Sequence, residues 1–147
     1  MFTKLKKFFE VQGETNDKDL RQLESACAVL LIEISKSDGE ASDIEQQAIT
    51  EYIANAFELK DEELTAVVAK SQSEEAQSTS YYPFVKLINE QYQYDKRVAL
   101  VKSMWQVAAA DGVIDAYEEH TIRKLADLLY VSHSDFIKTK LSVMDHQ

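Results

Sequence analysis

The sequence predicts an all-α protein, a single-domain bundle of about seven or eight helices. The chain of 147 residues contains 3 Gly and 1 Pro, so few positions interrupt a helix. Apolar residues recur at helical spacing in nearly every segment, and no segment shows the sustained alternation that is typical of β-strands. Hydrophobic residues make up 45% and charged residues 29%, the balance of an ordinary globular domain of this length.

The charge and the cysteine count exclude several classes of protein. Lys and Arg total 16 against 26 Asp and Glu, and the net charge of −10 repels phosphate backbones, which argues against nucleic acid as a partner. Cys27 is the single cysteine, so an intramolecular disulfide and a thiolate metal cage are both excluded. We expect a cytoplasmic protein, because the sequence shows neither a secretory leader nor an apolar run long enough to span a membrane.

The first predicted helix covers residues 2–11 and is amphipathic. Its apolar side carries Phe2, Phe8 and Phe9, and its opposite side is basic, with Lys4 and Lys6 among its residues. We interpret it as a helix that packs on the core. A helix that lies on a membrane surface is the alternative.

Three predicted helices follow, over residues 17–37, 43–57 and 61–72. Cys27 lies on the apolar stripe of the first of them, which predicts a buried and inert thiol. The segment Ser71–Ser80 is rich in Ser, Gln and Glu and has no apolar period, so we expect it to be a loop and the most mobile stretch of the chain.

The second half of the chain predicts four more helices. Pro83 stands near the start of one of them, where the missing N–H of proline costs nothing. The helix over residues 95–110 is apolar over so wide an arc that we expect it to be central, with Trp105 as a core residue. Helices over residues 115–129 and 133–144 complete the chain.

Two segments of the chain repeat each other. The run AVLLIEISKSDGEASDIEQQAI, which starts at Ala28, aligns without a gap on VKSMWQVAAADGVIDAYEEHTI, which starts at Val101. The repeats span about residues 20–57 and 95–130, and the alignment superimposes Asp38-Gly39 on Asp111-Gly112 and Glu45 on Glu118. Two such helix–turn–helix units can pack about a pseudo-two-fold axis, which would bring both Asp-Gly turns to one end of the bundle.

Helix capping explains most residues of these turns without any ligand. Gly39 and Gly112 stand where a helix end favours a left-handed residue. Ser42 and Glu45 have the spacing of a capping box, and Asp115 and Glu118 have the same spacing in the second copy. Capping does not explain Asp38 and Asp111, because an acid at a helix C-terminus meets the helix dipole with the wrong sign. Each of these two acids therefore requires a positive partner, which a lysine, an arginine or a metal ion would supply.

The repeated unit of an apolar helix, Asp-Gly and a following Glu resembles the TerB-like family of tellurite-resistance proteins. The second copy, ADGVIDAYEEHTIRKLADLL, is close to the family pattern and the first copy is looser. The resemblance covers about residues 20–145. The same domain type forms an N-terminal part of some membrane-anchored DnaJ-like co-chaperones. The resemblance implies an all-helical bundle, a bacterial cytoplasmic setting and a cation site built from the paired acidic turns.

Carried onto this sequence, the resemblance implies a metal site formed by Asp38, Glu45, Asp111 and Glu118. Asp115 and His120 are second-line candidates. Val113 stands where the first copy has Glu40, which argues against Glu40 as a ligand. Carboxylate oxygens suit Ca²⁺, Mg²⁺ or Mn²⁺, and Zn²⁺ is the poorer match unless the His120 ring turns inward.

The sequence carries no motif for catalysis. A nucleophile elbow, a glycine loop for phosphate and an H-E-x-x-H helix are all absent. We therefore expect a non-enzymatic interaction module of the bacterial stress or tellurite-resistance type that docks a protein partner, with a divalent cation as its cofactor. One alternative is a structural domain without metal, in which the acidic residues only cap helices. Another is an adaptor recruited to a membrane surface by the basic and aromatic N-terminal helix.

Overall fold

A computed structural model describes residues 17–36 and 42–145 of the chain, and the side chains from residue 22 onward. This part forms seven helices: α2 (Asp17–Ser35), α3 (Asp43–Ala56), α4 (Asp61–Gln77), α5 (Tyr82–Gln91), α6 (Tyr94–Ala108), α7 (Ala116–Leu128) and α8 (His133–Met144). The all-α prediction is confirmed. The predicted helix over residues 2–11 lies outside the described residues, as do Asp38, Gly39 and Glu40.

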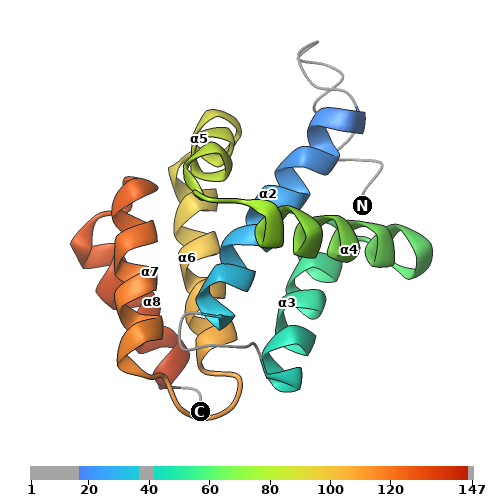
Figure 1. The fold of residues 1–147 in the computed structure, drawn as a ribbon. Coiled ribbons are helices and arrows are strands. Elements are labelled where there is room, and N and C mark those ends of the chain that lie inside the picture. Colours follow the sequence, from blue (N-terminus) through green and yellow to red (C-terminus); the bar gives the residue numbers. More distant parts are fainter. Residues whose placement is uncertain (1–16, 37–41, 146–147) are drawn as a thin grey trace.

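Helices α2 and α6 form the centre of the bundle. Helix α2 contacts α3, α4, α5, α6 and α7, and α6 also carries α8 on its outer side (Figure 1). Trp105 and Met104 on α6 are fully buried, as the wide apolar arc of this segment predicts, and the Trp105 ring packs against Phe136 of α8 with 5.2 Å between centroids. Trp105 is therefore a core residue.

The two repeats pack on each other with exchanged roles. Their first helices, α2 and α6, contact each other; α3 contacts α6, and α7 contacts α2. This exchange is the arrangement expected of a pseudo-two-fold axis between the copies. Both α3 and α7 begin at the same end of the bundle, the lower end in Figure 1.

Cys27 lies in the middle of this core. Its side chain is fully buried, and burial raises the pKa of the thiol to about 12. A thiol with so high a pKa is almost entirely protonated at neutral pH and is a poor nucleophile. The prediction of a buried and inert cysteine is confirmed.

The prediction of a loop over Ser71–Ser80 is wrong for most of its length. Helix α4 continues to Gln77, and the connection to α5 is limited to residues 78–81. Ser71 is buried and its Oγ donates to the carbonyl of Val68, while Glu74 accepts hydrogen bonds from Lys70 on its own helix and from Ser25 on α2. This end of α4 is attached to α2 by polar contacts, which an analysis of apolar periodicity does not detect.

Within the described residues, none of the helices combines the length and the apolar character that a membrane span requires.

Candidate functional site: paired carboxyl groups at the repeat turns

Two capping boxes build the first turns of α3 and α7. Glu45 N donates to Ser42 Oγ at 3.1 Å and Ser42 N donates to Glu45 Oε1 at 3.2 Å. In the second copy Glu118 N donates to Asp115 Oδ1 at 2.8 Å and Asp115 N donates to Glu118 Oε1 at 3.1 Å. Both predicted boxes are confirmed, and each holds its Glu side chain against the start of its helix.

The two glutamates of these boxes meet in the interior. Glu45 is 4% exposed and Glu118 is 2% exposed, values that are unusual for an acidic residue. Burial, and next the adjacent carboxyl of Glu45, raise the pKa of Glu118 to about 9, although the Asp115 N–H lowers it in part. The sequence alignment of Glu45 with Glu118 therefore corresponds to a contact between the two side chains.

One oxygen of this pair has no hydrogen-bond donor. Glu45 Oε1 accepts from the Ser42 N–H, whereas Glu45 Oε2 is buried without a partner. A buried carboxylate oxygen without a donor is costly, and a second carboxyl beside it supplies a donor only when it is protonated. A proton or a cation between the two carboxyl groups removes this conflict.

Asp111 is placed differently from this pair. The residue is exposed, and its Oδ1 accepts a hydrogen bond from Val113 N at 3.0 Å, which closes the turn between α6 and α7. Gly112 has the predicted left-handed backbone, with φ of 92°, but it lies within this turn because the cap of α6 is Ala109. The Val113 N–H and solvent are therefore the observed surroundings of the Asp111 charge.

The remaining predicted site residues contribute in different ways. Asp38 lies outside the described residues. Asp115 is half-buried and serves as the cap of α7, and His120 is exposed on the surface of α7. The described residues contain no cluster of three or more His, Cys, Asp or Glu side chains in metal-binding geometry. The structure thus joins Glu45 with Glu118 and leaves Asp111 at the surface.

The donor set of this pair fits a hard divalent cation. Carboxylate oxygens are the ligands that Ca²⁺, Mg²⁺ and Mn²⁺ prefer, and the Oε2 atom of Glu45 is available for one. The capping bonds leave the second oxygen of each carboxyl for such an ion. The exposed position of His120 supplies nothing that would favour Zn²⁺.

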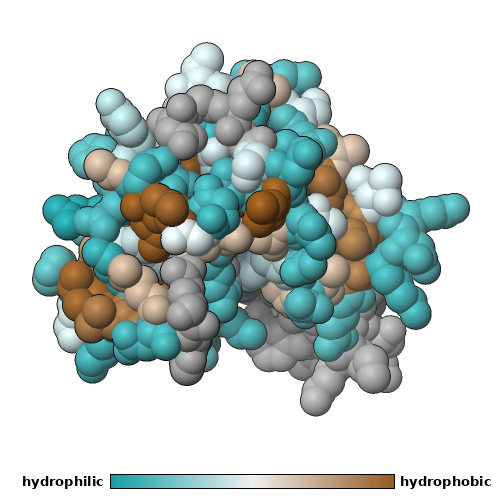
Figure 2. All heavy atoms as spheres, turned by 90° about the horizontal axis from the view of Figure 1, so that it is seen from below, coloured by the Kyte–Doolittle hydropathy of each residue, from teal (hydrophilic) through white to brown (hydrophobic). Residues whose placement is uncertain are grey.

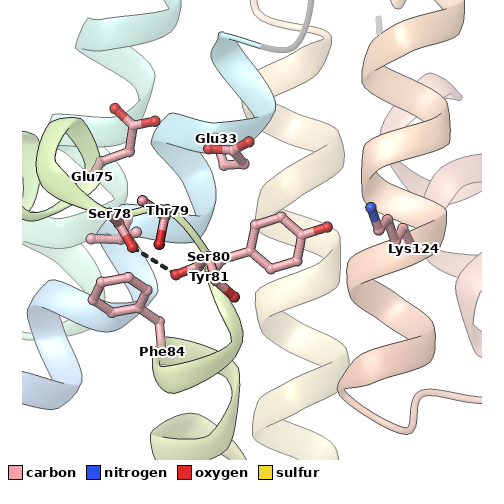
Figure 3. A pocket seen from close by; sticks show the side chains of 9 residues that line it. Glu33, Glu75, Ser78, Thr79, Ser80, Tyr81, Phe84 and Lys124 are labelled. Atoms are coloured by element: carbon pink, nitrogen blue, oxygen red, sulfur yellow. Dashed lines mark hydrogen bonds between the residues drawn. The ribbon is translucent and has the colours of Figure 1, made fainter.

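A second pair of carboxyl groups was not predicted. Glu33 on α2 and Glu75 on α4 line a pocket, and Lys36 Nζ lies 2.8 Å from Glu75 Oε1 (Figure 3). The sequence offers no signal for this pair, because its members belong to two helices with no repeat relationship and Glu33 only ends an apolar run. Even the helix that carries Glu75 was expected to have ended before it.

Comparison with known proteins places the chain in one family. The family model described as tellurite resistance protein TerB matches residues 24–141, which extend from α2 into α8 and include both repeats. Searches of curated proteins and of solved structures gave no significant match. The match covers most of the chain and contains the buried glutamate pair, its two capping boxes and both acidic turns, and the chain therefore belongs to the TerB family.

Proposed function

We propose that this TerB domain is a non-enzymatic interaction module whose paired acidic turns bind a divalent cation. The observation that carries the proposal is the contact of two buried carboxyl groups, one from each repeat, with Glu45 Oε2 left without a donor. Family membership supports a role in bacterial tellurite or related stress resistance, and we expect that role in the cytoplasm.

The electrostatics of the pair favour a cation. Two buried carboxylates repel each other and lose hydration, so the pair holds a proton until a stronger positive partner enters. The raised pKa of Glu118 is the consequence of this conflict. Ca²⁺, Mg²⁺ or Mn²⁺ would be held by Glu45 and Glu118, with Asp38 and Asp111 of the adjoining turns as further ligands. The ion supplies the positive charge that the two repeats lack at this point.

Exposed apolar residues near the same turns support the docking of a protein partner. Ile44 in the first turn of α3, Val113 in the α6–α7 turn and Tyr117 in the first turn of α7 are 54%, 67% and 69% exposed. Figure 2 views this end of the molecule and shows hydrophobic residues scattered among hydrophilic ones. A cation that fixes the turns would also fix these side chains, and metal binding would thereby control the docking surface.

Thermal unfolding tests the metal site. The wild-type protein and the double variant Glu45→Gln/Glu118→Gln are melted in EDTA and in excess Ca²⁺, Mg²⁺ or Mn²⁺; glutamine keeps the capping hydrogen bonds and removes the charges. We expect at least one ion to raise the wild-type Tm, by up to about 2.7 kcal/mol of stability at a hundredfold excess over Kd. The double variant should show no shift.

A matched control separates this site from general ion effects. Glu62→Gln removes one charge from the exposed first turn of α4 and should retain the full metal shift. A folded wild-type protein with the same Tm in EDTA and in all three ions contradicts the proposal. That result would favour a scaffold domain in which the glutamates only cap helices, a function that the two complete capping boxes support.

A further inference from the structure

The pocket at Glu33 and Glu75 lies away from the repeat turns. It has a volume of about 360 Å³ and is bounded by α2, the end of α4, the segment of residues 78–81, the start of α5 and α7 (Figure 3). This volume is at the lower end of the range for small-molecule sites. The lining combines two carboxyl groups, the hydroxyl side chains of residues 78–80 and the aromatic rings of Tyr81 and Phe84.

The two carboxyl groups of the pocket are short of positive charge. Burial, and next the adjacent carboxyl of Glu75, raise the pKa of Glu33, and this holds although Lys36 and Lys124 both act to lower it. The Glu75 side chain is 12% exposed and already binds the Lys36 ammonium. A further cation is therefore favoured at Glu33 even with the salt bridge of Lys36 in place.

Lys124 stands on the other side of the pocket and does not fill it. Figure 3 shows the Lys124 side chain on α7, separated from Glu33 and near the Tyr81 ring. Its Nζ lies 5.5 Å from the centroid of that ring, the residue is exposed, and the Tyr81 hydroxyl raises the pKa of the Lys124 ammonium. Lys124 is thus a positive group at the rim that repels a cation from outside.

The other walls suit a cation with an apolar body. Tyr81 and Phe84 present aromatic rings, which attract ammonium and guanidinium groups and also pack against aliphatic chains. Ser78 and Ser80 expose hydroxyl oxygens that can accept from N–H donors, and Val29 adds an aliphatic wall. A hydrated metal ion would use the carboxyl groups alone and leave the aromatic side of the pocket empty.

We propose that this pocket binds a small organic cation, with an alkylammonium or guanidinium group at Glu33 and Glu75 and the aliphatic body against Phe84. The cation replaces the proton that the carboxyl pair holds and forms charge-assisted hydrogen bonds with it. The same chemical group occurs in free amines and in the lysine or arginine side chain of a partner protein. The experiment distinguishes these two sources.

Calorimetric titration in EDTA buffer tests the proposal with two probes, free agmatine and a Gly-Ser peptide that carries one arginine. We expect binding of at least one probe to the wild type and a loss of affinity of about tenfold or more in Glu33→Gln/Glu75→Gln. Tighter binding of agmatine identifies a free amine as the ligand, and tighter binding of the peptide identifies a partner's basic side chain. No binding of either probe to the folded wild type overturns the proposal.

Variants of opposite expected sign make the test independent of folding defects. Lys124→Gln removes the ammonium at the rim and should strengthen binding about two- to threefold. Glu62→Gln, on the exposed first turn of α4, should leave binding unchanged. The metal-site variant Glu45→Gln/Glu118→Gln should bind the probes as the wild type does, so failure of one site does not imply failure of the other. Weaker binding in Lys124→Gln would indicate an anionic ligand and overturn the proposal.

Discussion

The two carboxyl pairs of this domain face the same electrostatic conflict in different surroundings. Glu45 and Glu118 are almost completely buried and are held by capping hydrogen bonds, and one oxygen has no donor. Glu33 and Glu75 line an open pocket, where Lys36 binds one carboxyl and Lys124 stands at the rim. The comparison shows that position in the fold, more than residue type, decides what relieves two adjacent negative charges.

The buried pair accepts only what is small enough to enter between two helix starts, which is a proton or a metal ion. The open pair is partly neutralised by a side chain of the protein itself and has space and aromatic walls for a larger cation. If this difference is correct, charge removal should have a large effect at the buried pair and a small one at the open pair, because solvent screens the latter.

The largest expected effect is the pH dependence of stability in the absence of metal. The pKa of Glu118 is about 9 in the folded protein against 4.5 for an ordinary glutamate. Its contribution to stability is therefore complete below about pH 4.5 and is lost as the pH rises toward 9. We expect the free energy of unfolding in EDTA to fall by an amount on the order of 2 kcal/mol between pH 5 and pH 8, measured by urea unfolding.

The control for this prediction uses one variant from each pair. Glu118→Gln should remove most of that decrease, whereas Glu33→Gln should keep it. A Glu118→Gln protein that loses as much stability as the wild type over this pH range would show that the buried pair is not the source.

A smaller effect is expected from the caps that position the buried pair. Ser42→Ala and Asp115→Ala each remove the side-chain acceptor of a capping box and should lower the free energy of unfolding by about 1 kcal/mol. Asp115→Ser keeps an acceptor and serves as the matched control. Thermal melts measure all three, and equal losses for Ala and Ser at position 115 would contradict a capping role.

A still smaller effect of opposite sign is expected at the open pair. Glu33→Gln removes one of two adjacent charges and should raise the free energy of unfolding at pH 8 by a few tenths of a kcal/mol, since the site is open to solvent. Glu75→Gln should gain less, because it also loses the Lys36 salt bridge. Urea unfolding compares the two variants, and a Glu33→Gln protein that is clearly destabilised would show that the pair is satisfied in another way.

The smallest effect is expected from the salt bridge itself. The Lys36 side chain is 43% exposed, so Lys36→Gln should cost less than about 0.5 kcal/mol. Lys138→Gln, on the exposed surface of α8, is the matched control for the loss of one positive charge. A cost above 1 kcal/mol at Lys36 in urea unfolding would place this pair closer to the buried one than the structure indicates.

Local sequence patterns predicted most of the helices correctly. The expected helices over residues 43–57, 95–110 and 133–144 correspond closely to α3, α6 and α8. Both capping boxes were predicted, because a cap depends on residues three positions apart and on no distant contact. The same locality explains the error over Ser71–Gln77, where a helix without an apolar stripe is stabilised by α2 through Glu74 and Glu75.

By itself, the sequence determined the helical class, the caps and the equivalence of Glu45 and Glu118, since periodicity, capping and repetition can all be read along the chain. The tertiary structure alone decided that these two glutamates are buried together, that Asp111 stays at the surface, and that Glu33 and Glu75 share a pocket. The physical reason is range: backbone hydrogen bonds act over a few residues, whereas burial and charge contacts depend on which helices pack together.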